Sequence, residues 1–310
     1  MENNPDGGDL SFAPQFDANP YDIHTTTYPD TVGFVAETAD GTPAGTGFVS
    51  FVAARLGGEV RRTAYLNNLA VAAPYRNRGL ATRLAHERIE LVESRLGADP
   101  PVWATIQQGN EPSRAVADSW AEHTVYEQTG LGVEPDTSAD TRGYEVREAR
   151  PEELPRVAER VNAFYADAEL FTPYTAEGIR ERCARSPVDV PVRRYVVALD
   201  GDEVVAGADV LDMHEAMWID VEGDGDLPPV VPDDGEVRPR SVLNPWFTDG
   251  AADAARALVA HLRANPAGAN RITFQSGPAH PFAEVLEDAG ARPVMRHTTA
   301  LRGVAKPATD

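Results

Sequence analysis

The same order of strand-like and helix-like segments occurs twice along the chain, and this repetition limits the fold more than any other feature. Residues 31–120 read as three strands, a helix, a strand and a helix, because apolar residues first alternate and then recur at helical spacing. Residues 144–289 repeat this order, and the Gly, Pro, Asp and Thr of 130–143 have the composition of an interdomain linker. We therefore predict two domains, residues 1–140 and 141–310.

The first domain begins with an irregular arm over residues 1–30, in which we expect at most one short strand. A strand–turn–strand hairpin is predicted next, then a third strand, then a helix from Leu80 that stops at Gly97, then a strand and a helix beginning at Asn110. Three successive strands form an antiparallel meander. The fold class is therefore α/β (α+β), with a mixed, mostly antiparallel sheet flanked by helices in each domain.

In the second domain the predicted strands are 195–199, 204–211, 217–221, 242–243 and 272–274, and the predicted helices include 251–262 and 282–289. An ungapped offset of 171 residues aligns Pro74 and Tyr75 with Pro245 and Trp246, and Gly79 with Gly250. At this offset the second domain has Phe247, Asp249 and Asp253 in place of Arg76, Arg78 and Thr82. Two carboxylates would repel an anion there.

Charge and composition exclude several classes of function. The formal charge of −21 argues against a nucleic acid partner, because binding to phosphates needs positive charge. No apolar run is long enough to cross a bilayer, and the first residues lack a signal sequence. We therefore expect a cytoplasmic protein with no membrane partner. We expect it to be a monomer or a homodimer. Lys306 is the single lysine, and this acidic, lysine-poor composition resembles that of proteins from extreme halophiles.

The sequence predicts no metal site. Cys183 is the single cysteine, so neither an internal disulfide nor a cysteine-based metal site is possible, and the seven histidines show no ligand spacing. Residues 220–226 imitate the first half of a calcium loop, but the position that needs Glu is Val231. An acidic surface insertion is the better interpretation.

The chemically informative segment is 69–82, a strand that leads through a basic turn containing Gly79 into a helix. The first amides of a helix lack internal partners and lie at the positive end of its dipole, so they bind phosphate oxygens. Gly79 permits a close backbone approach, Arg76 and Arg78 add positive charge, and Thr82 adds a hydroxyl. Taken alone, Arg-x-x-Gly-x-Ala fits an ordinary strand-to-helix turn with solvated arginines equally well.

With the strand before it, the helix after it and the later Asn110-x-x-Ser113, this segment resembles the GCN5-related N-acetyltransferase (GNAT) family, whose signature is Q/R-x-x-G-x-G/A. The resemblance implies two tandem acyl-CoA N-acyltransferase folds, the second degenerate. It also implies acetyl-CoA as cosubstrate, with its pantetheine arm on the backbone of Leu69, Ala70 and Val71 and near Asn110. Its pyrophosphate would be held by the amides of Arg76, Asn77, Arg78, Gly79, Leu80, Ala81 and Thr82.

In this family, a primary amine of a small molecule or peptide attacks the thioester directly, and no covalent enzyme intermediate forms. Many members carry a Tyr seven residues after the Asn110 position, but this chain has Ala117 there. Tyr126 as a general acid, Glu59 as a base and Asn68 as a substrate contact are weak candidates, so the sequence identifies no catalytic residue. A non-catalytic CoA-binding sensor or regulatory module therefore stays open, as does a purely structural or interaction protein.

Overall fold

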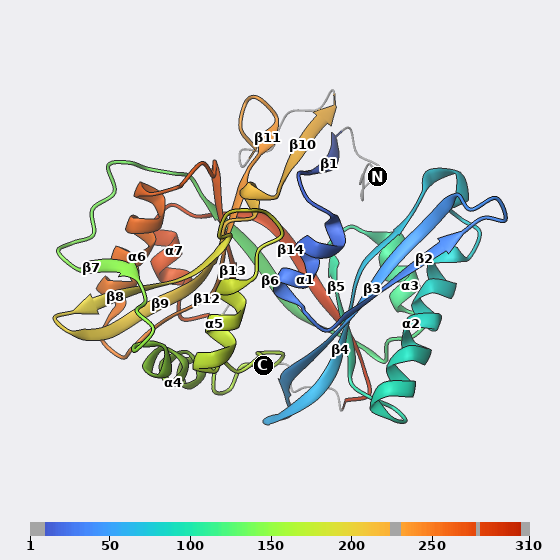
Figure 1. The fold of residues 1–310 in the computed structure, drawn as a ribbon, viewed down its shortest axis with the longest axis horizontal. Coiled ribbons are helices and arrows are strands. Elements are labelled where there is room, and N and C mark those ends of the chain that lie inside the picture. Colours follow the sequence, from blue (N-terminus) through green and yellow to red (C-terminus); the bar gives the residue numbers. More distant parts are fainter. Residues whose placement is uncertain (1–9, 224–230, 277–279, 305–310) are drawn as a thin grey trace.

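The computed structural model describes residues 10–223, 231–276 and 280–304 (Figure 1). Eleven of the described strands form one continuous sheet, in the order β2-β3-β4-β5-β14-β6-β13-β12-β9-β8-β7. Within this sheet the pairs β4·β5 and β12·β13 are parallel and the others are antiparallel. The predicted fold class, mixed and mostly antiparallel with flanking helices, is confirmed.

The first half of the sheet is the predicted meander. Its strands are β2 (Thr31–Glu37), β3 (Pro43–Leu56) and β4 (Glu59–Val71), followed by α2 (Leu80–Leu96), β5 (Val102–Gln107) and α3 (Glu111–Ala117). Helices α2 and α3 cover one face, where Val49 and Leu66 pack with Ile89. Helix α1 (Pro20–Thr27) lies on the other face, because Phe48, which alternates with Val49, contacts its residues Tyr21 and His24.

The second half has the same arrangement (Figure 1). Its strands are β7 (Glu145–Glu148), β8 (Arg193–Asp200), β9 (Glu203–Leu211), β12 (Pro239–Phe247) and β13 (Arg271–Ser276). Helices α6 (Ala252–Ala264) and α7 (Ala283–Asp288) pack on one face, and α4 (Leu154–Phe164) and α5 (Ala176–Ala184) on the other. None of the described helices is long and apolar enough to span a membrane.

The two halves exchange their last strands. β14 (Arg292–Arg302), from the end of the chain, pairs with β5 of the first half. β6 (His123–Val133), from the first half, pairs with β13 of the second. β6 and β14 also pair with each other, so the sheet runs unbroken from one half to the other. The domain boundary near residue 140 stays a prediction, since the strands at the centre of the sheet belong to both halves.

Several predicted elements were wrong in detail. The arm of residues 1–30 contains a helix, α1, as well as the strand β1 (Leu10–Phe16). The predicted linker begins too early, because β6 continues to Val133. The segment 217–221 is not the third strand of the second meander. It is β10 (Met217–Gly223), which pairs with β1 and with β11 (Glu236–Val237) in a small separate sheet, and β12 takes the predicted place. The apparent calcium loop lies partly outside the described residues.

Candidate functional site

The turn before α2 presents open backbone amides. Gly79 caps the helix with a φ of 75°, a left-handed conformation that suits glycine, and no side chain caps the first turn. The first amide of α2 with a backbone partner is that of Arg83, which donates to the carbonyl oxygen of Gly79 at 3.0 Å. The amides of Leu80, Ala81 and Thr82 therefore remain available to an anion at the positive end of the helix dipole.

The surroundings of this turn are basic. A cavity of about 290 Å³ lies against it, with Arg78, Arg83 and Gly79 in its wall and Glu37 as its one carboxylate. Arg78 lies over the ring of Tyr75, 6.0 Å from its centroid. Arg76 and Asn77 are exposed, and Arg76 Nε donates to the carbonyl oxygen of Val71 at 3.0 Å. The predicted diphosphate-binding residues thus surround one open turn.

Strands β4 and β5 separate immediately after they pair. Their parallel register contains only Ala64 opposite Val102 and Tyr65 opposite Trp103. Within the described residues, the edge of β4 that faces β5 has no neighbouring strand from Leu66 onward. We call this unpaired stretch beside β4, which leads to the turn at Gly79, the opening; the family resemblance predicts it.

A β-bulge decides which residues of β4 face this opening. The amide of Ala64 donates toward β5, to Pro101, whereas that of Ala72 donates toward β3, to Ala44. In a regular strand the N–H and C=O groups of successive residues point to alternate neighbouring strands. The amides of Ala64 and Ala72, eight residues apart, would then point to the same neighbouring strand. The bulge at Asn68, where φ is 49°, reverses the alternation.

After the bulge, Leu69 and Val71 turn their N–H and C=O groups to the opening. Ala70 lies opposite Thr46, and its N–H and C=O groups point to β3. Of the three residues predicted to pair with pantetheine, Leu69 and Val71 therefore have their backbone groups at the free edge, whereas those of Ala70 pair with β3.

A buried arginine supports the bulge. Arg88 of α2 is 2% exposed, and its Nη1 donates to the carbonyl oxygens of Phe48 and Asn67 at 3.1 and 3.2 Å. Its Nε donates to the carbonyl oxygen of Leu84 at 3.0 Å. Burial lowers the pKa of Arg88 to about 10, so the guanidinium stays charged at neutral pH. Nothing in the sequence pattern distinguished Arg88 from a surface arginine of the helix.

The remaining candidates lie in different places. Asn110 begins α3 just after β5, and its Oδ1 accepts a hydrogen bond from the amide of Ser113 at 3.0 Å. Ala117 is buried in the core, so no hydroxyl replaces the tyrosine of the family there. Glu59 is at the start of β4, on the order of 40 Å from Val71 at the far end, which is too far for a base. The side chain of Tyr126 lies outside the described residues.

The second half has the same bulge at Asn244, with a φ of 45°, but its alignment with the first half differs from the predicted offset. The amide of Thr248 donates to Val205 of β9, just as that of Ala72 donates to β3. Val71 therefore corresponds to Phe247.

The predicted match of Pro74 and Tyr75 to Pro245 and Trp246 is wrong. Pro74 and Tyr75 lie in a short 3-10 helix (Ala73–Tyr75), whereas Pro245 and Trp246 lie in β12. Eight residues, 72–79, connect β4 to α2, whereas four, 248–251, connect β12 to α6.

The edge of β12 is closed to a pantetheine arm. Pro245 takes the place of Leu69 and has no N–H. Its carbonyl oxygen accepts a hydrogen bond from the Tyr165 hydroxyl at 2.8 Å, and Trp246 beside it is completely buried. The amide of Ala251 at the helix entrance is also used, since it donates to the carbonyl oxygen of Thr248.

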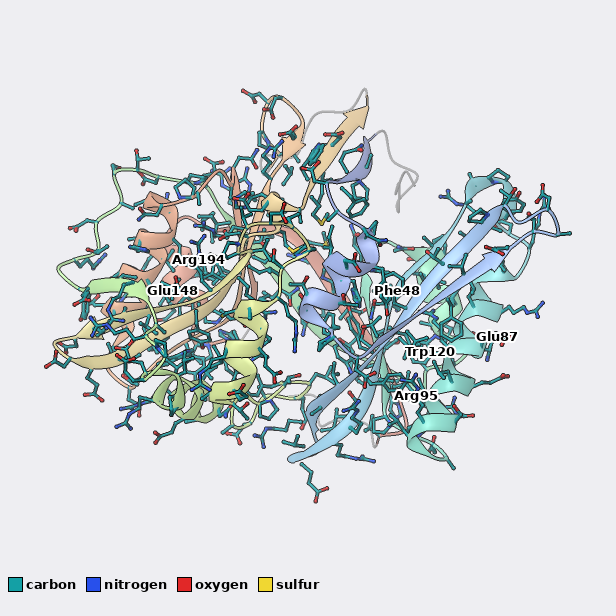
Figure 2. The ribbon with its side chains drawn as sticks, in the orientation of Figure 1. Phe48, Glu87, Arg95, Trp120, Glu148 and Arg194 are labelled. Carbon is teal, nitrogen blue, oxygen red and sulfur yellow. The ribbon has the colours of Figure 1, made fainter. Side chains whose placement is uncertain are left out.

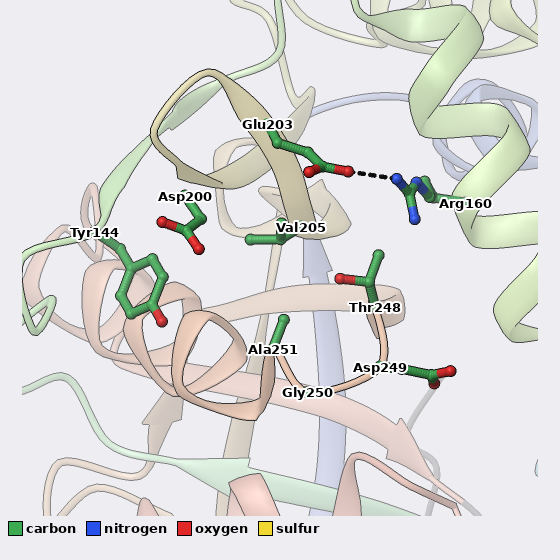
Figure 3. A pocket seen from close by; sticks show the side chains of 9 residues that line it. All are labelled: Tyr144, Arg160, Asp200, Glu203, Val205, Thr248, Asp249, Gly250 and Ala251. Carbon is green, nitrogen blue, oxygen red and sulfur yellow. Dashed lines mark hydrogen bonds and ion pairs between the residues drawn. The ribbon is translucent and has the colours of Figure 1, made fainter.

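A cavity of about 440 Å³ lies at this second turn (Figure 3). Asp200, Glu203 and Asp249 line it, and Arg160, its one basic residue, pairs with Glu203 at 2.6 Å. The cavity therefore carries excess negative charge, which disfavours a diphosphate. The two turns have the same place in the fold and opposite electrostatic character.

Comparison with known proteins agrees with this geometry. Residues 8–119 match the family described as "Acetyltransferase (GNAT) family". No curated protein matches the chain by sequence. The fold is similar to that of N-myristoyltransferase from Saccharomyces cerevisiae with bound myristoyl-CoA, with a TM-score of 0.70 and 11% identity over 99% of this chain and 77% of that one.

Two GCN5-related N-acetyltransferases are also similar in fold. The protein from Sphaerobacter thermophilus has a TM-score of 0.55 and 14% identity, over 90% of this chain and 82% of that one. The protein from Anabaena variabilis has a TM-score of 0.53 and 12% identity, over 92% and 65%. Residues 8–119 thus belong to the GNAT acetyltransferase family, and the chain as a whole has the fold of two GNAT domains in tandem.

Proposed function

We propose that the protein is an N-acyltransferase that moves the acetyl group of acetyl-CoA to a primary amine of a small molecule or peptide. The observation that carries this proposal is the combination, in the first half alone, of an open helix entrance at Gly79 with a free strand edge at Leu69 and Val71. The entrance suits a diphosphate and the edge suits the amides of a pantetheine arm. The second half, in which Pro245 removes a donor from the strand edge and carboxylates line the turn, is a degenerate copy.

Binding of the cofactor involves the residues at both ends of this path. The amides of residues 77–82 and the side chain of Arg76, whose own amide donates to the carbonyl oxygen of Ala73, hold the diphosphate, and the arm runs from there back along β4. Arg76 Nε donates to the Val71 carbonyl oxygen. An amide of the arm takes over that acceptor and leaves the guanidinium for a phosphate. Asn110, at the end of β5, borders the arm on the other side of the opening.

The side chains where β4 and β5 separate favour a short acyl group. Where β4 and β5 separate, the rings of Tyr65 and Trp103 stack with centroids 4.0 Å apart. The Tyr65 hydroxyl and Thr105 Oγ1 are 2.9 Å apart across the two strands. These packed side chains lie where the arm would end, so acetyl requires less rearrangement of them than a long chain does. Calorimetry with acetyl-CoA and myristoyl-CoA tests this step, and tighter binding of myristoyl-CoA would contradict it.

The reaction needs no covalent intermediate. The neutral amine attacks the thioester carbon, a C–N bond forms and the C–S bond breaks. A backbone amide of Leu69 or Val71 at the free edge donates to the carbonyl oxygen as negative charge develops on it. The amine loses a proton and the thiolate leaves as CoA.

A CoA-binding sensor is the second candidate, and the buried methyl group at Ala117, where a general acid is usual, favours it. We expect acetyl-CoA to bind saturably in calorimetry and free CoA thiol to appear when a polyamine, an aminoglycoside, an amino acid or a peptide is added. Binding without release from any amine would favour the sensor. Absence of binding would contradict both candidates and leave a structural role.

We also infer a cytoplasmic setting of high salt, with no nucleic acid partner and a monomeric or homodimeric state. With a formal charge of −21, self-repulsion opposes compaction, and salt screens it. We expect the melting temperature to rise by several degrees between 0.1 M and 2 M KCl, measured by circular dichroism. An unchanged or lower melting temperature would contradict this inference.

A further inference from the structure

A histidine of α1 lies on the face of the sheet opposite α2, beside the bulge of β4. His24 Nε2 is 2.9 Å from Ser50 Oγ on β3, and Asn67 Nδ2 on β4 is 3.1 Å from the same oxygen. The imidazole lies against the rings of Tyr28 and Phe48, with centroids 5.1 and 5.0 Å away. Phe48 is labelled in Figure 2. Asn67 directly precedes the bulge residue Asn68, so His24 is connected to the bulge through one hydroxyl group.

The hydrogen atoms of this network can be assigned one by one. Thr31 Oγ1 is 2.6 Å from the carbonyl oxygen of Tyr28, which only accepts, so the Thr31 hydroxyl donates there. Ser50 Oγ is 2.9 Å from Thr31 Oγ1, whose hydrogen is already used, so Ser50 donates to Thr31. Ser50 Oγ then has no hydrogen left and accepts from its other neighbours. His24 Nε2 must therefore carry a hydrogen, and in the neutral ring Nδ1 carries a lone pair.

This lone pair is unused. Within the described residues Nδ1 of His24 has no hydrogen-bond partner, and it is not among the polar atoms sealed from solvent. Burial lowers the pKa of His24 to about 4, so the ring is neutral at pH 7. No carboxylate of the described part of the chain forms an ion pair with it. Nearby, Asn67 Oδ1 also lacks a donor, but it is sealed from solvent, so Nδ1 of His24 is the accessible acceptor of this network.

In the proposed binding mode, the network lies near the acyl end of the cofactor. With the diphosphate at residues 76–82 and the arm along Val71 and Leu69, the next residues in that direction are Asn68 and Asn67. Because Leu66 packs under α2, the side chain of Asn67 is on the α1 face. In this binding mode the accessible Nδ1 of His24 lies on the same face as Asn67, the face that α2 leaves free, near the thioester end of the arm.

We propose that the acceptor amine binds on the α1 face of the first half and that His24 Nδ1 accepts its proton. This inference rests on the proposed acetyltransferase function and adds to it the base that the sequence lacks. In the balanced step the amine nitrogen forms the C–N bond, its proton moves to Nδ1, and the C–S bond breaks. The imidazolium then returns the proton to the CoA thiolate or to water.

The titratable groups around His24 support a neutral amine as the substrate. Desolvation raises the pKa values of Tyr28, which follows the last residue of α1, and of Tyr65 on β4, and so keeps both uncharged. The positive charge of Arg193, in the second half, lowers the pKa of Tyr28. Asp209 neutralises this charge, because the Arg193 guanidinium donates two hydrogen bonds of 2.7 Å to its carboxylate. A site with acceptors, aromatic rings and no free carboxylate favours the uncharged amine, the form that attacks.

The test compares His24→Gln with His86→Gln. Glutamine places its amide nitrogen near the position of Nε2, so it can still donate to Ser50 but has no basic atom. We expect kcat to fall by about 100-fold or more, as for loss of a general base, with the KM and calorimetric affinity for acetyl-CoA unchanged. His86 is exposed on α2, and its substitution should leave kcat unchanged.

His24→Ala gives a second readout, since imidazole added to the buffer should restore part of its activity. A His24→Gln enzyme within a factor of about three of the wild type, or a His24→Ala enzyme that imidazole does not rescue, would overturn the assignment while leaving the acetyltransferase function intact. A wild-type protein that binds no acetyl-CoA or releases no thiol would overturn both proposals. Near-ultraviolet circular dichroism checks that each variant is folded.

Discussion

Gly79→Asp is expected to abolish acetyl-CoA binding, whereas Gly250→Asp is expected to leave it unchanged. The new carboxylate would lie at the helix entrance, within a few ångströms of the diphosphate. A unit charge about 4 Å from a phosphate near a protein surface costs about 4 kcal/mol, which is about a thousandfold in affinity. Gly250 lies at the second turn, which already carries Asp249 and binds no diphosphate in the proposed function. Isothermal titration calorimetry measures both variants.

The Gly79→Ala variant separates the effect of a new charge at position 79 from the effect of losing the glycine backbone. A Cβ atom on Gly79 would have no atom within 4 Å, so alanine adds no clash. It adds only the strain of the left-handed φ of 75°, about 1–2 kcal/mol. We therefore expect a lower melting temperature but retained binding for Gly79→Ala, and lost binding for Arg78→Glu. Equal effects of aspartate at positions 79 and 250 would contradict the asymmetry of the two halves.

The part of the site that the sequence predicted is local. The strand, the basic turn and the amphipathic helix of residues 69–96 are adjacent in the chain, and a change of hydrophobic period marks where one element ends and the next begins. The left-handed glycine at the turn was predictable for the same reason. The separation of β4 from β5 followed from the family resemblance and not from any residue pattern.

The parts that the sequence did not predict depend on distant contacts. The exchange of β6 and β14 joins residues far apart in the chain, and periodicity carries no information about strand partners. The bulge at Asn68 and its counterpart at Asn244 are single-residue insertions that leave the apolar pattern intact. The ungapped offset failed because the connection after β12 is shorter than that after β4, which no ungapped comparison represents.

The strand exchange also gives the second half a structural role in the first site. β14 lies between β5 and β6, where it continues the sheet of the first half beyond the opening. The first half would therefore have an unpaired β5 edge without the end of the chain. The second copy thus contributes to the first site through the sheet, whether or not it binds a ligand of its own.

Arg88→Met should destabilise the fold by about 3 kcal/mol, because three carbonyl oxygens lose their donor in a buried place. Two of them, of Phe48 and Asn67, flank the bulge that turns Leu69 and Val71 to the opening. The variant should therefore also weaken acetyl-CoA binding under conditions in which it remains folded. Urea unfolding followed by circular dichroism measures the stability, and calorimetry measures the binding.

Gly47 supplies a matched test of the same contact. A Cβ atom on Gly47 would lie 3.1 Å from the Arg88 guanidinium carbon, so Gly47→Ala must displace the guanidinium from the bulge. In the Arg88→Met variant the guanidinium is absent, so Gly47→Ala should reduce the free energy of unfolding by less than it does in the wild type. The double-mutant cycle is expected to show a coupling of about 1 kcal/mol or more, since the two residues act through one contact. Additive effects, or an Arg88→Met variant as stable as the wild type, would mean that the bulge forms without the arginine and that the opening beside β4 is set by strand pairing alone.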